Sequence, residues 1–293
     1  MGAEKDPYAH LDPRVRHLAA APDDQRRACI LADLWVPYPA GEQAVEILLW
    51  LVRQAPRLKM PSFLFCGNPH MGKSKIIERF NELLALDLAA DPGRDTALVV
   101  PTPPTCDERR IYDAILLAME FRTPMEINLS RLQRIVIDQL TARRVRLLIF
   151  EEMQQMVEQR APVVRVCLNT LKYLSNELRL SIAGFGSGEA KALINLDAHL
   201  AVRFSVVELE SWTQRKPWLR KVVENRISLM PFRHPTKVDR PLLEALRQQT
   251  KGRVGDYFDF LESAGLLALD EGAEYLTPDL IDRGAQRRRG GMR

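Results

Sequence analysis

The stretch Gly67-Asn68-Pro69-His70-Met71-Gly72-Lys73-Ser74 decides how the rest of this chain is interpreted. It satisfies the phosphate-loop pattern G-x-x-x-x-G-K-[ST] at every fixed position. The apolar run at residues 62–66 before it predicts a buried strand, and the apolar rhythm at residues 75–86 after it predicts a helix. A strand, a glycine-containing loop and a helix form the geometry that binds a nucleoside triphosphate.

The pattern assigns a role to each part of the loop. The glycines let main-chain N–H groups turn toward the phosphates, and the helix N-terminus adds partial positive charge. Lys73 is expected to reach the β- and γ-phosphates of ATP, and Ser74 is expected to hold Mg²⁺. The expected nucleotide-binding residues of the loop are Gly67, Asn68, Pro69, His70, Met71, Gly72, Lys73 and Ser74.

The composition is that of an ordinary globular protein. The 293 residues are 46% hydrophobic and 27% charged, and the formal net charge of +4 permits an anionic partner without requiring one. The four cysteines form no C-x-x-C pair and the five histidines lack ligand spacing, which argues against a zinc site and a disulfide framework. No apolar run is long enough for a membrane span, and residues 1–6 lack a signal core, so we expect a reducing cytoplasm.

Apolar runs alternate with helical patterns through the first two thirds of the chain, which predicts an α/β fold with a parallel sheet covered by helices on both faces. The expected strands are residues 62–66, 97–101, 146–150, 180–183 and 204–208. The expected helices among them are residues 41–54, 75–86, 107–119, 129–142 and 163–178. After Glu210 only helical patterns follow, at residues 217–229, 241–249 and 256–267 and in a short last helix opened by Thr277-Pro278.

These patterns predict four parts. Residues 1–29 form an N-terminal extension, residues 30–210 a nucleotide-binding α/β domain, and residues 211–282 a small helical domain. The tail at residues 283–293, which contains Arg287-Arg288-Arg289-Gly290-Gly291, is expected to be disordered because it has almost no apolar residues.

A second buried strand ends in two acids. The apolar run at residues 147–150 continues into Glu151 and Glu152. Glu151 is placed to hold the Mg²⁺ shell, and Glu152 is placed to polarise a water molecule for attack on the γ-phosphate. The alternative is a strand that simply ends at a solvated, acidic helix start.

The order of these elements resembles that of the AAA+ ATPases and, within them, the TniB/TnsC branch of DNA-transposition ATPases. The closer similarity lies at residues 35–38, 56–61 and 184–190, and at residues 201–204 followed by 209–212. The resemblance covers residues 30–282 and implies a P-loop NTPase with a five-stranded parallel sheet and a C-terminal helical lid.

The resemblance also implies further site residues. Ser187 stands where a sensor near the γ-phosphate would lie, and Arg203 matches the arginine that one subunit presents to its neighbour's nucleotide. Arg253 stands at the sensor position of the lid. A turn hydroxyl, a helix cap and a solvated turn are the respective alternatives. The linker residues expected to pack on adenine, or else to belong to the core, are Trp35, Val36 and Tyr38.

One position departs from the family pattern. The acidic strand end is usually Asp then Glu, whereas this chain has Glu151 then Glu152. The extra methylene shifts the carboxylate relative to the magnesium shell, and phosphoryl transfer depends on placement. We therefore expect slow hydrolysis with intact ATP binding.

The resemblance implies assembly as a ring or helical filament on duplex DNA, together with a DDE transposase and a TniQ-like target selector. Phosphate contacts would position each subunit without reading bases, and repetition along a filament would strengthen them. The candidate contacts, each of which fits a solvated helix face equally well, are Arg109, Arg110, Arg131, Arg134, Arg143 and Arg144.

Three other functions remain open from the sequence. A helicase loader or replication initiator of the same fold would also bind DNA, although no helix-turn-helix domain is recognisable after the lid. A P-loop kinase would need an acceptor pocket and would not need Arg203 from a neighbour. A signalling switch that holds ATP with little turnover is compatible with Glu151.

Overall fold

The computed structural model describes residues 6–90, 96–122, 127–196, 202–213 and 216–290. The chain divides into two compact units. The sheet unit comprises Ala40–Pro69 and Lys73–Glu210, and the helical unit comprises Met1–Pro39, His70–Gly72 and Ser211–Arg293. The phosphate loop thus begins and ends in the sheet unit, while its tip groups with the helical unit.

The sheet unit contains five parallel strands, as the sequence predicted, and their order is β2-β3-β4-β1-β5. The strands are β1 (Ser62–Cys66), β2 (Thr96–Pro101), β3 (Val145–Glu151), β4 (Ser181–Gly186) and β5 (Phe204–Glu208). β4 lies between β1 and β3, with Phe185 opposite Phe65 and Gly184 opposite Phe150. A single strand therefore separates the strand before the phosphate loop from the strand that ends in two acids.

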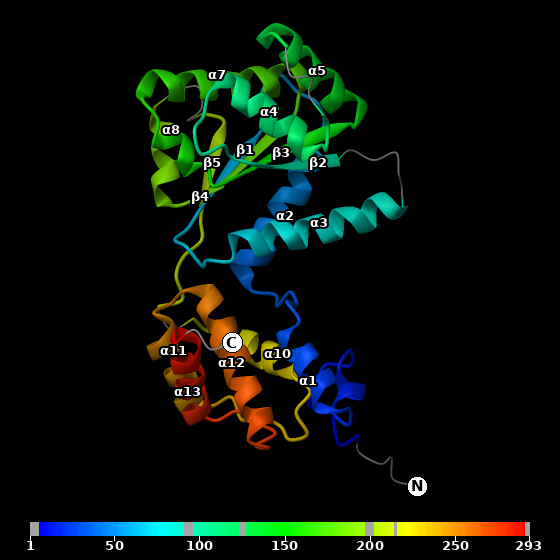
Figure 1. Ribbon diagram of the computed structural model, residues 1–293, viewed down its shortest axis with the longest axis vertical. Helices are drawn as coiled ribbons and strands as arrows, with labels where there is room; N and C mark the ends of the chain where they lie inside the picture. Colours follow the sequence, from blue (N-terminus) through cyan, green and yellow to red (C-terminus); the bar gives the residue numbers. More distant parts are fainter. Residues whose placement is uncertain (1–5, 91–95, 123–126, 197–201, 214–215, 291–293) are drawn as a thin grey trace. The chain divides into compact units, whose positions relative to one another are not determined.

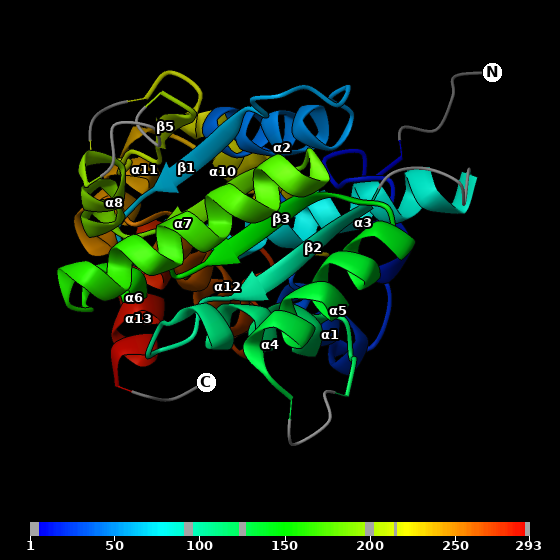
Figure 2. The ribbon, with the colours of Figure 1, turned by 90° about the horizontal axis from the view of Figure 1, so that it is seen from above.

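Helices cover both faces of the sheet (Figure 1). One face carries α4 (Glu108–Ala118), α5 (Leu129–Ala142) and α7 (Ala161–Leu178), which lie side by side over the strands (Figure 2). The other face carries α2 (Pro39–Val52) and α3 (Lys73–Ala90). Successive β1 residues serve opposite faces: Leu64 joins the core under α7, whereas Phe63 packs edge-on against Trp50 of α2, with ring centroids 6.3 Å apart.

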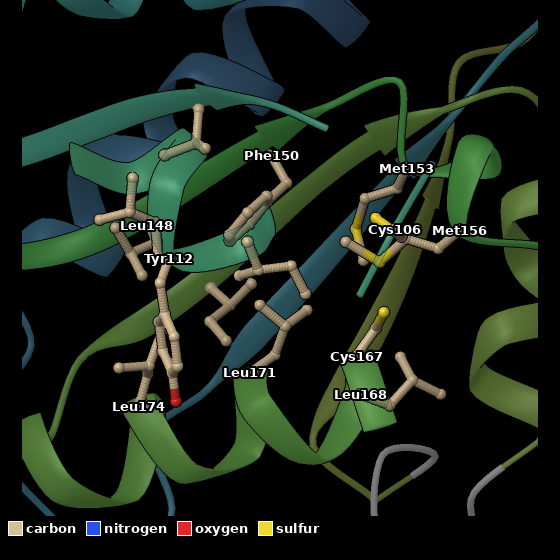
Figure 3. Packing of buried hydrophobic residues seen from close by; sticks show 14 of the residues in the cluster. Cys106, Tyr112, Leu148, Phe150, Met153, Met156, Cys167, Leu168, Leu171 and Leu174 are labelled. Atoms are coloured by element: carbon tan, nitrogen blue, oxygen red, sulfur yellow. The ribbon is translucent and has the colours of Figure 1, made fainter. Parts of the chain in front are cut away.

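The core beneath α4, α5 and α7 fixes β3. Leu148 and Phe150 of β3 point toward Leu171 and Leu174 of α7 and Tyr112 of α4 (Figure 3). All five side chains are buried, and each such burial contributes about 1.5–3 kcal/mol. The strand that ends in Glu151 is therefore held on a rigid support. Short elements follow β3 and β4, namely α6 (Gln154–Val157), η2 (Gly188–Ala190) and α8 (Lys191–Asn195).

The helical unit is organised around α12 (Val254–Asp270). This helix packs against α1 (Asp23–Leu31), α10 (Leu219–Ser228), α11 (Arg240–Thr250) and α13 (Pro278–Arg289). Gly284 of α13 allows a very close approach, because a Cβ there would lie 2.7 Å from the main-chain nitrogen of Ala264. Thr277 begins α13 as predicted, since its side chain accepts a hydrogen bond from the Leu280 N–H.

The structure corrects the predicted disordered tail at residues 283–293, because α13 continues to Arg289. Two arginines of this helix are paired with acids of α12. Arg287 lies 3.2 Å from Asp270, and Arg288 lies 3.0 Å from Asp259. The few apolar residues of this segment therefore do not prevent a helix, because interhelical ion pairs hold it. Residues 291–293 lie outside the described residues.

The first part of the chain belongs to the helical unit, rather than forming a separate extension that ends at residue 29. The turn η1 (Arg16–Leu18) precedes α1, and α1 contacts α12. Arg26 of α1 is only 1% exposed. Its guanidinium donates to the Pro231 carbonyl at 2.9 Å and to the Glu274 carboxylate.

No helix among the described residues has the length and apolarity that a membrane crossing requires.

Glu274→Gln is expected to lower the free energy of unfolding by about 3 kcal/mol at pH 7, because it leaves the buried Arg26 charge without its main partner. Burial raises the pKa of the Glu274 carboxyl, but the hydrogen bonds from Arg26 and Arg233 outweigh it and hold that pKa below its usual range. The contribution is therefore complete above the unfolded-state pKa of about 4.3 and is lost as the pH falls through the folded-state pKa.

Urea unfolding at pH 7 and about pH 3 measures this difference. The matched control is Glu271→Gln, which breaks an exposed ion pair with Arg283 and should cost less than about 1 kcal/mol. Equal stabilities of the two variants at pH 7 would show that the Arg26–Glu274 pair does not stabilise the fold.

Candidate active site

The phosphate loop connects the end of β1 to the start of α3. The Gly67 N–H donates to the Gly186 carbonyl at 3.1 Å, which ties the loop to the end of β4. His70 and Gly72 have left-handed backbones, with φ of 64° and 79°. Gly72 requires a glycine, because a Cβ would be strained at this φ and would lie 2.9 Å from the Tyr38 hydroxyl oxygen. These two residues give the loop its curvature.

Lys73 places its ammonium inside the curve of the loop. Its Nζ donates to the carbonyls of Gly67 at 2.8 Å and Asn68 at 3.1 Å. Partial burial lowers the pKa of Lys73, although the Glu152 carboxylate opposes this shift. The loop therefore presents a cation within a ring of main-chain groups, which fits an anionic phosphate; Ser74, the next residue, is exposed at the start of α3.

Three of the predicted site elements meet at one edge of the sheet. The carboxyl ends of parallel strands share an edge, so the loop after β1, Ser187 after β4 and the acids at the end of β3 are neighbours. The Ser187 hydroxyl accepts a hydrogen bond from the Glu189 N–H at 3.3 Å, which caps η2. The structure thus brings the loop, Ser187, Glu151 and Glu152 together.

The two acids differ in environment. Burial raises the pKa of Glu151, and the neighbouring Glu152 carboxylate raises it further. A divalent cation would offset both effects, so this pair fits a magnesium shell. Glu152 is exposed and has φ of 53°, a backbone conformation that is uncommon for residues other than glycine. Such conformations are often found at functional sites.

Gln154 also lies at this edge of the sheet, but the sequence did not predict it as a site residue. Its side-chain N–H donates to the Glu152 carboxylate, and its carbonyl oxygen accepts a hydrogen bond from the Ser187 N–H at 3.0 Å. One amide side chain therefore links the end of β3 to the residue after β4. A glutamine two residues after an acidic pair also fits a solvated helix start, so the sequence carried no signal for this role.

Arg203 lies at the opposite edge of the sheet. Its carbonyl accepts a hydrogen bond from the Ser62 N–H at 3.1 Å, at the amino ends of β1 and β5. Its guanidinium donates to the Asn176 side chain at 2.8 Å. The length of β1 puts about 16 Å between this edge and the phosphate loop. The structure does not bring Arg203 to the loop of its own chain.

The predicted linker and lid residues lie in the helical unit. Val36 and Tyr38 are buried, and Trp35 is half-buried with its ring centroid 5.8 Å from that of Tyr38. Arg253 lies just before α12, where its Nε and Nη2 are 2.7 and 2.6 Å from the Asp256 carboxylate. Arg253 is therefore already paired within the helical unit.

The six candidate DNA-contacting arginines separate into two groups. Arg109 and Arg110 lie in the first turn of α4, beyond the carboxyl end of β2, and Arg109 donates to the Ile127 carbonyl at 2.9 Å, just before α5. Exposed Arg131 and Arg134 of α5 form no ion pair with any other described residue. The second group, which precedes β3 at the opposite edge, comprises Arg143 and Arg144.

The sequence profile described as "Bacterial TniB protein" matches residues 26–214, which is more than half of the chain. The chain belongs to the TniB family. The matched residues include the phosphate loop, all five strands, the acidic pair and Arg203. The profile therefore ends just after the sheet unit and leaves α10 to α13 of this TniB-family protein outside the match.

Solved structures similar to this TniB-family protein share its fold at low sequence identity. The Aeropyrum pernix Orc1 protein in complex with DNA has a TM-score of 0.67 and 16% identity, covering 89% of this chain and 69% of that chain. The A. pernix Orc2 protein in ADPNP and ADP complexes has a TM-score of 0.64 and 16% identity, covering 89% and 71%.

The Thermotoga maritima RuvB Holliday junction branch migration motor has a TM-score of 0.51 and 13% identity, covering 84% of this chain and 68% of that chain. No curated protein matches the sequence. The predicted fold is confirmed: this TniB-family protein has the AAA+ P-loop ATPase fold, with a five-stranded parallel sheet and a C-terminal helical domain.

Proposed function

We propose that this protein is an ATP-dependent, DNA-binding regulator of transposition that oligomerises on target duplex DNA and recruits or activates a DDE transposase. ATP hydrolysis resets the assembly. The observation that carries the proposal is the distribution of site residues over the sheet. The loop with Lys73, Ser187 and the acidic pair share the carboxyl edge, whereas Arg203 lies at the amino edge.

The residues at the carboxyl edge of the sheet have separate roles in ATP hydrolysis. The loop main chain and Lys73 hold the phosphates, while Ser74 and Glu151 hold Mg²⁺, which neutralises charge on the phosphate oxygens when bound. Glu152 orients the attacking water, and Gln154 holds the Glu152 carboxylate in place. Ser187 is the sensor that responds to the γ-phosphate at this edge of the sheet. The proposed nucleotide contacts outside the sheet unit are Trp35, Val36, Tyr38 and Arg253.

Lys73→Ala is expected to weaken ATP binding by about 100-fold, because charge-assisted hydrogen bonds to phosphate are each worth about 1.5–3 kcal/mol. Isothermal titration calorimetry with ATP and Mg²⁺ measures the change. The matched control is Lys75→Ala, which removes the same charge two residues further along α3, where Lys75 pairs with Glu78 at 2.6 Å. Absence of adenine-nucleotide binding by the wild-type protein would refute the proposed function itself.

The position of Arg203 at the amino edge of the sheet supports assembly into an oligomer. Because its guanidinium is far from the loop of its own chain, Arg203 is proposed to act at a neighbour's loop, so that the ATPase site is completed between two copies. Repetition of this contact generates a ring or a helical filament. Negative-stain microscopy of the protein with linear duplex DNA and a slowly hydrolysed ATP analogue tests this: rings or filaments are expected, and free monomers would contradict it.

Duplex DNA is proposed to bind arginines of the first group, which comprises Arg109, Arg110, Arg131 and Arg134. The A. pernix Orc1 structure, which is a complex with DNA, supports DNA binding by a protein of this fold. Arg131 and Arg134 are exposed on α5, whereas Arg110 is engaged by Asp107 and Thr105. The α5 pair is therefore available for phosphate contacts that do not read bases.

The double variant Arg131→Ala/Arg134→Ala is expected to weaken duplex binding and to reduce the dependence of log K on log salt by about two units, since each phosphate contact contributes a slope of about 0.9. Fluorescence anisotropy with ATP over a salt series measures both quantities. Arg143→Ala, at the opposite edge of the sheet, should leave the slope unchanged. A reduced slope for Arg143→Ala alone would place the DNA on the other group.

The proposal includes further partners and a location. A DDE transposase and a TniQ-like target selector are the expected protein partners, and the bacterial cytoplasm, at the nucleoid when on DNA, is the expected compartment. A helicase loader or replication initiator is the alternative. The fold similarity to Orc1 suits both functions, and membership of the TniB family favours the first. Pull-down with purified transposase against replicative helicase discriminates them.

A further inference from the structure

Tyr38 carries a buried polar atom without a partner. The side chain is 4% exposed, and its hydroxyl oxygen accepts or donates no hydrogen bond within the part of the chain that the structure describes. A buried hydroxyl left unpaired costs about 1–3 kcal/mol. Buried polar groups in native proteins are nearly always paired with protein, water or a ligand. The hydroxyl therefore indicates an additional molecule at this position.

The ring of Tyr38 is held in place, so the hydroxyl cannot simply turn to solvent. Trp212 packs edge-on against it, with ring centroids 5.3 Å apart and an interplanar angle of 71°. Trp212 is itself fixed. Its main-chain N–H donates to the Gly252 carbonyl at 2.7 Å, its main-chain carbonyl accepts from the Tyr257 hydroxyl at 3.3 Å, and its ring packs on that of Tyr257 with centroids 5.2 Å apart. The direction of the Tyr38 hydroxyl is thus built into the helical unit.

That direction leads to the last glycine of the phosphate loop. A Cβ on Gly72 would lie 2.9 Å from the Tyr38 hydroxyl oxygen, and the next atom, of Val254, would be 3.8 Å away. Main-chain N–H groups of this part of a phosphate loop hold the phosphates, not the base. Burial raises the pKa of the Tyr38 phenol, so the group stays protonated and can donate to an anion.

We infer that the Tyr38 hydroxyl donates a hydrogen bond to a phosphate oxygen of a nucleoside di- or triphosphate beside Gly72. The inference rests on the proposed nucleotide binding and deepens it. It gives Tyr38 a role different from the adenine packing that the sequence suggested. The ring serves as a rigid support on Trp212, and the hydroxyl is the group that contacts the ligand. A bound water is the competing occupant of the same position.

The test compares Tyr38→Phe with Tyr257→Phe, which removes the same atom from the same aromatic cluster. Without nucleotide, Tyr38→Phe should be at least as stable as the wild type, because it removes an unpaired hydroxyl. Tyr257→Phe should be less stable, because its hydroxyl is bonded to Trp212. Thermal unfolding followed by circular dichroism measures both.

With ADP, Tyr38→Phe rather than Tyr257→Phe should be the impaired variant. Tyr38→Phe should bind ADP about 10- to 100-fold more weakly, as expected for a hydrogen bond to a charged group, and should lose most of the ADP-induced rise in Tm. Tyr257→Phe should keep the wild-type Kd. Adenosine, which lacks phosphate, should bind the wild type and Tyr38→Phe equally in competition titrations.

Several results would overturn the inference. Wild-type ADP affinity in Tyr38→Phe would assign the hydroxyl to water, and an equal loss for adenosine and ADP would return Tyr38 to the base. A loss of stability without nucleotide, together with unchanged ADP binding, would make the hydroxyl purely structural. Failure of the wild type to bind ADP would instead refute the proposed function, so the two failures are distinguishable.

Discussion

Arg203→Ala is expected to lower the ATP turnover of the assembled protein by about 10³-fold or more while leaving ATP affinity nearly unchanged. An arginine that acts on the transition-state phosphate of a neighbour contributes about 10³–10⁵ in rate. Arg203 lies at the amino edge of the sheet, away from the loop that binds the nucleotide, so its loss should spare binding. Phosphate release and calorimetry with ATP separate the two effects.

Mixing variants tests whether Arg203 acts between copies. Arg203→Ala retains Glu152, and Glu152→Gln retains Arg203, so a mixed assembly contains some complete sites although each variant alone is inactive. Turnover should therefore reappear on mixing. Asn176→Ala serves as a control, because it removes only the partner that holds the guanidinium at 2.8 Å and should keep turnover. No recovery on mixing would show that Arg203 acts in its own chain or not at all.

Glu152→Gln is expected to preserve ATP binding and to reduce turnover by about 10²–10⁴-fold, the contribution of a positioned general base. The amide has the same shape as the carboxylate but cannot take a proton. Glu158→Gln, an exposed position just after α6, is the matched control and should hydrolyse ATP normally. Undiminished phosphate release from Glu152→Gln would remove this residue from its role.

The elements around the nucleotide were predictable because their signals are local. A fixed glycine and lysine spacing marks the loop, and unbroken apolar runs mark doubly buried strands. The bounds of β1 and β5 agree with the prediction. β4 extends three residues further than predicted, through Gly186. A Gly-Phe-Gly run favours a turn locally, but here it is buried between two strands, and tertiary packing overrides the local preference.

The residues that were missed depend on distant partners. Arg26 is buried against Glu274, 248 positions away, and nothing near Arg26 in the sequence distinguishes it from a solvated helix charge. The same holds for Arg287 and Arg288 of α13, whose partners lie on α12. Gln154 becomes meaningful only when the strand order places β4 beside β3. Composition and periodicity record burial, but they do not record which two segments meet.

The position of Arg203 at the sheet edge opposite the phosphate loop has a consequence for how the proposed filament grows. A contact in which one edge of a subunit meets the other edge of the next is heterologous, so successive copies all face the same way. In the proposed assembly, an open filament would have two unlike ends: one would display an unused arginine, and the other an unused loop. A protein that recognises only one kind of terminus would act at a single tip, and the polymer would carry a direction along the DNA.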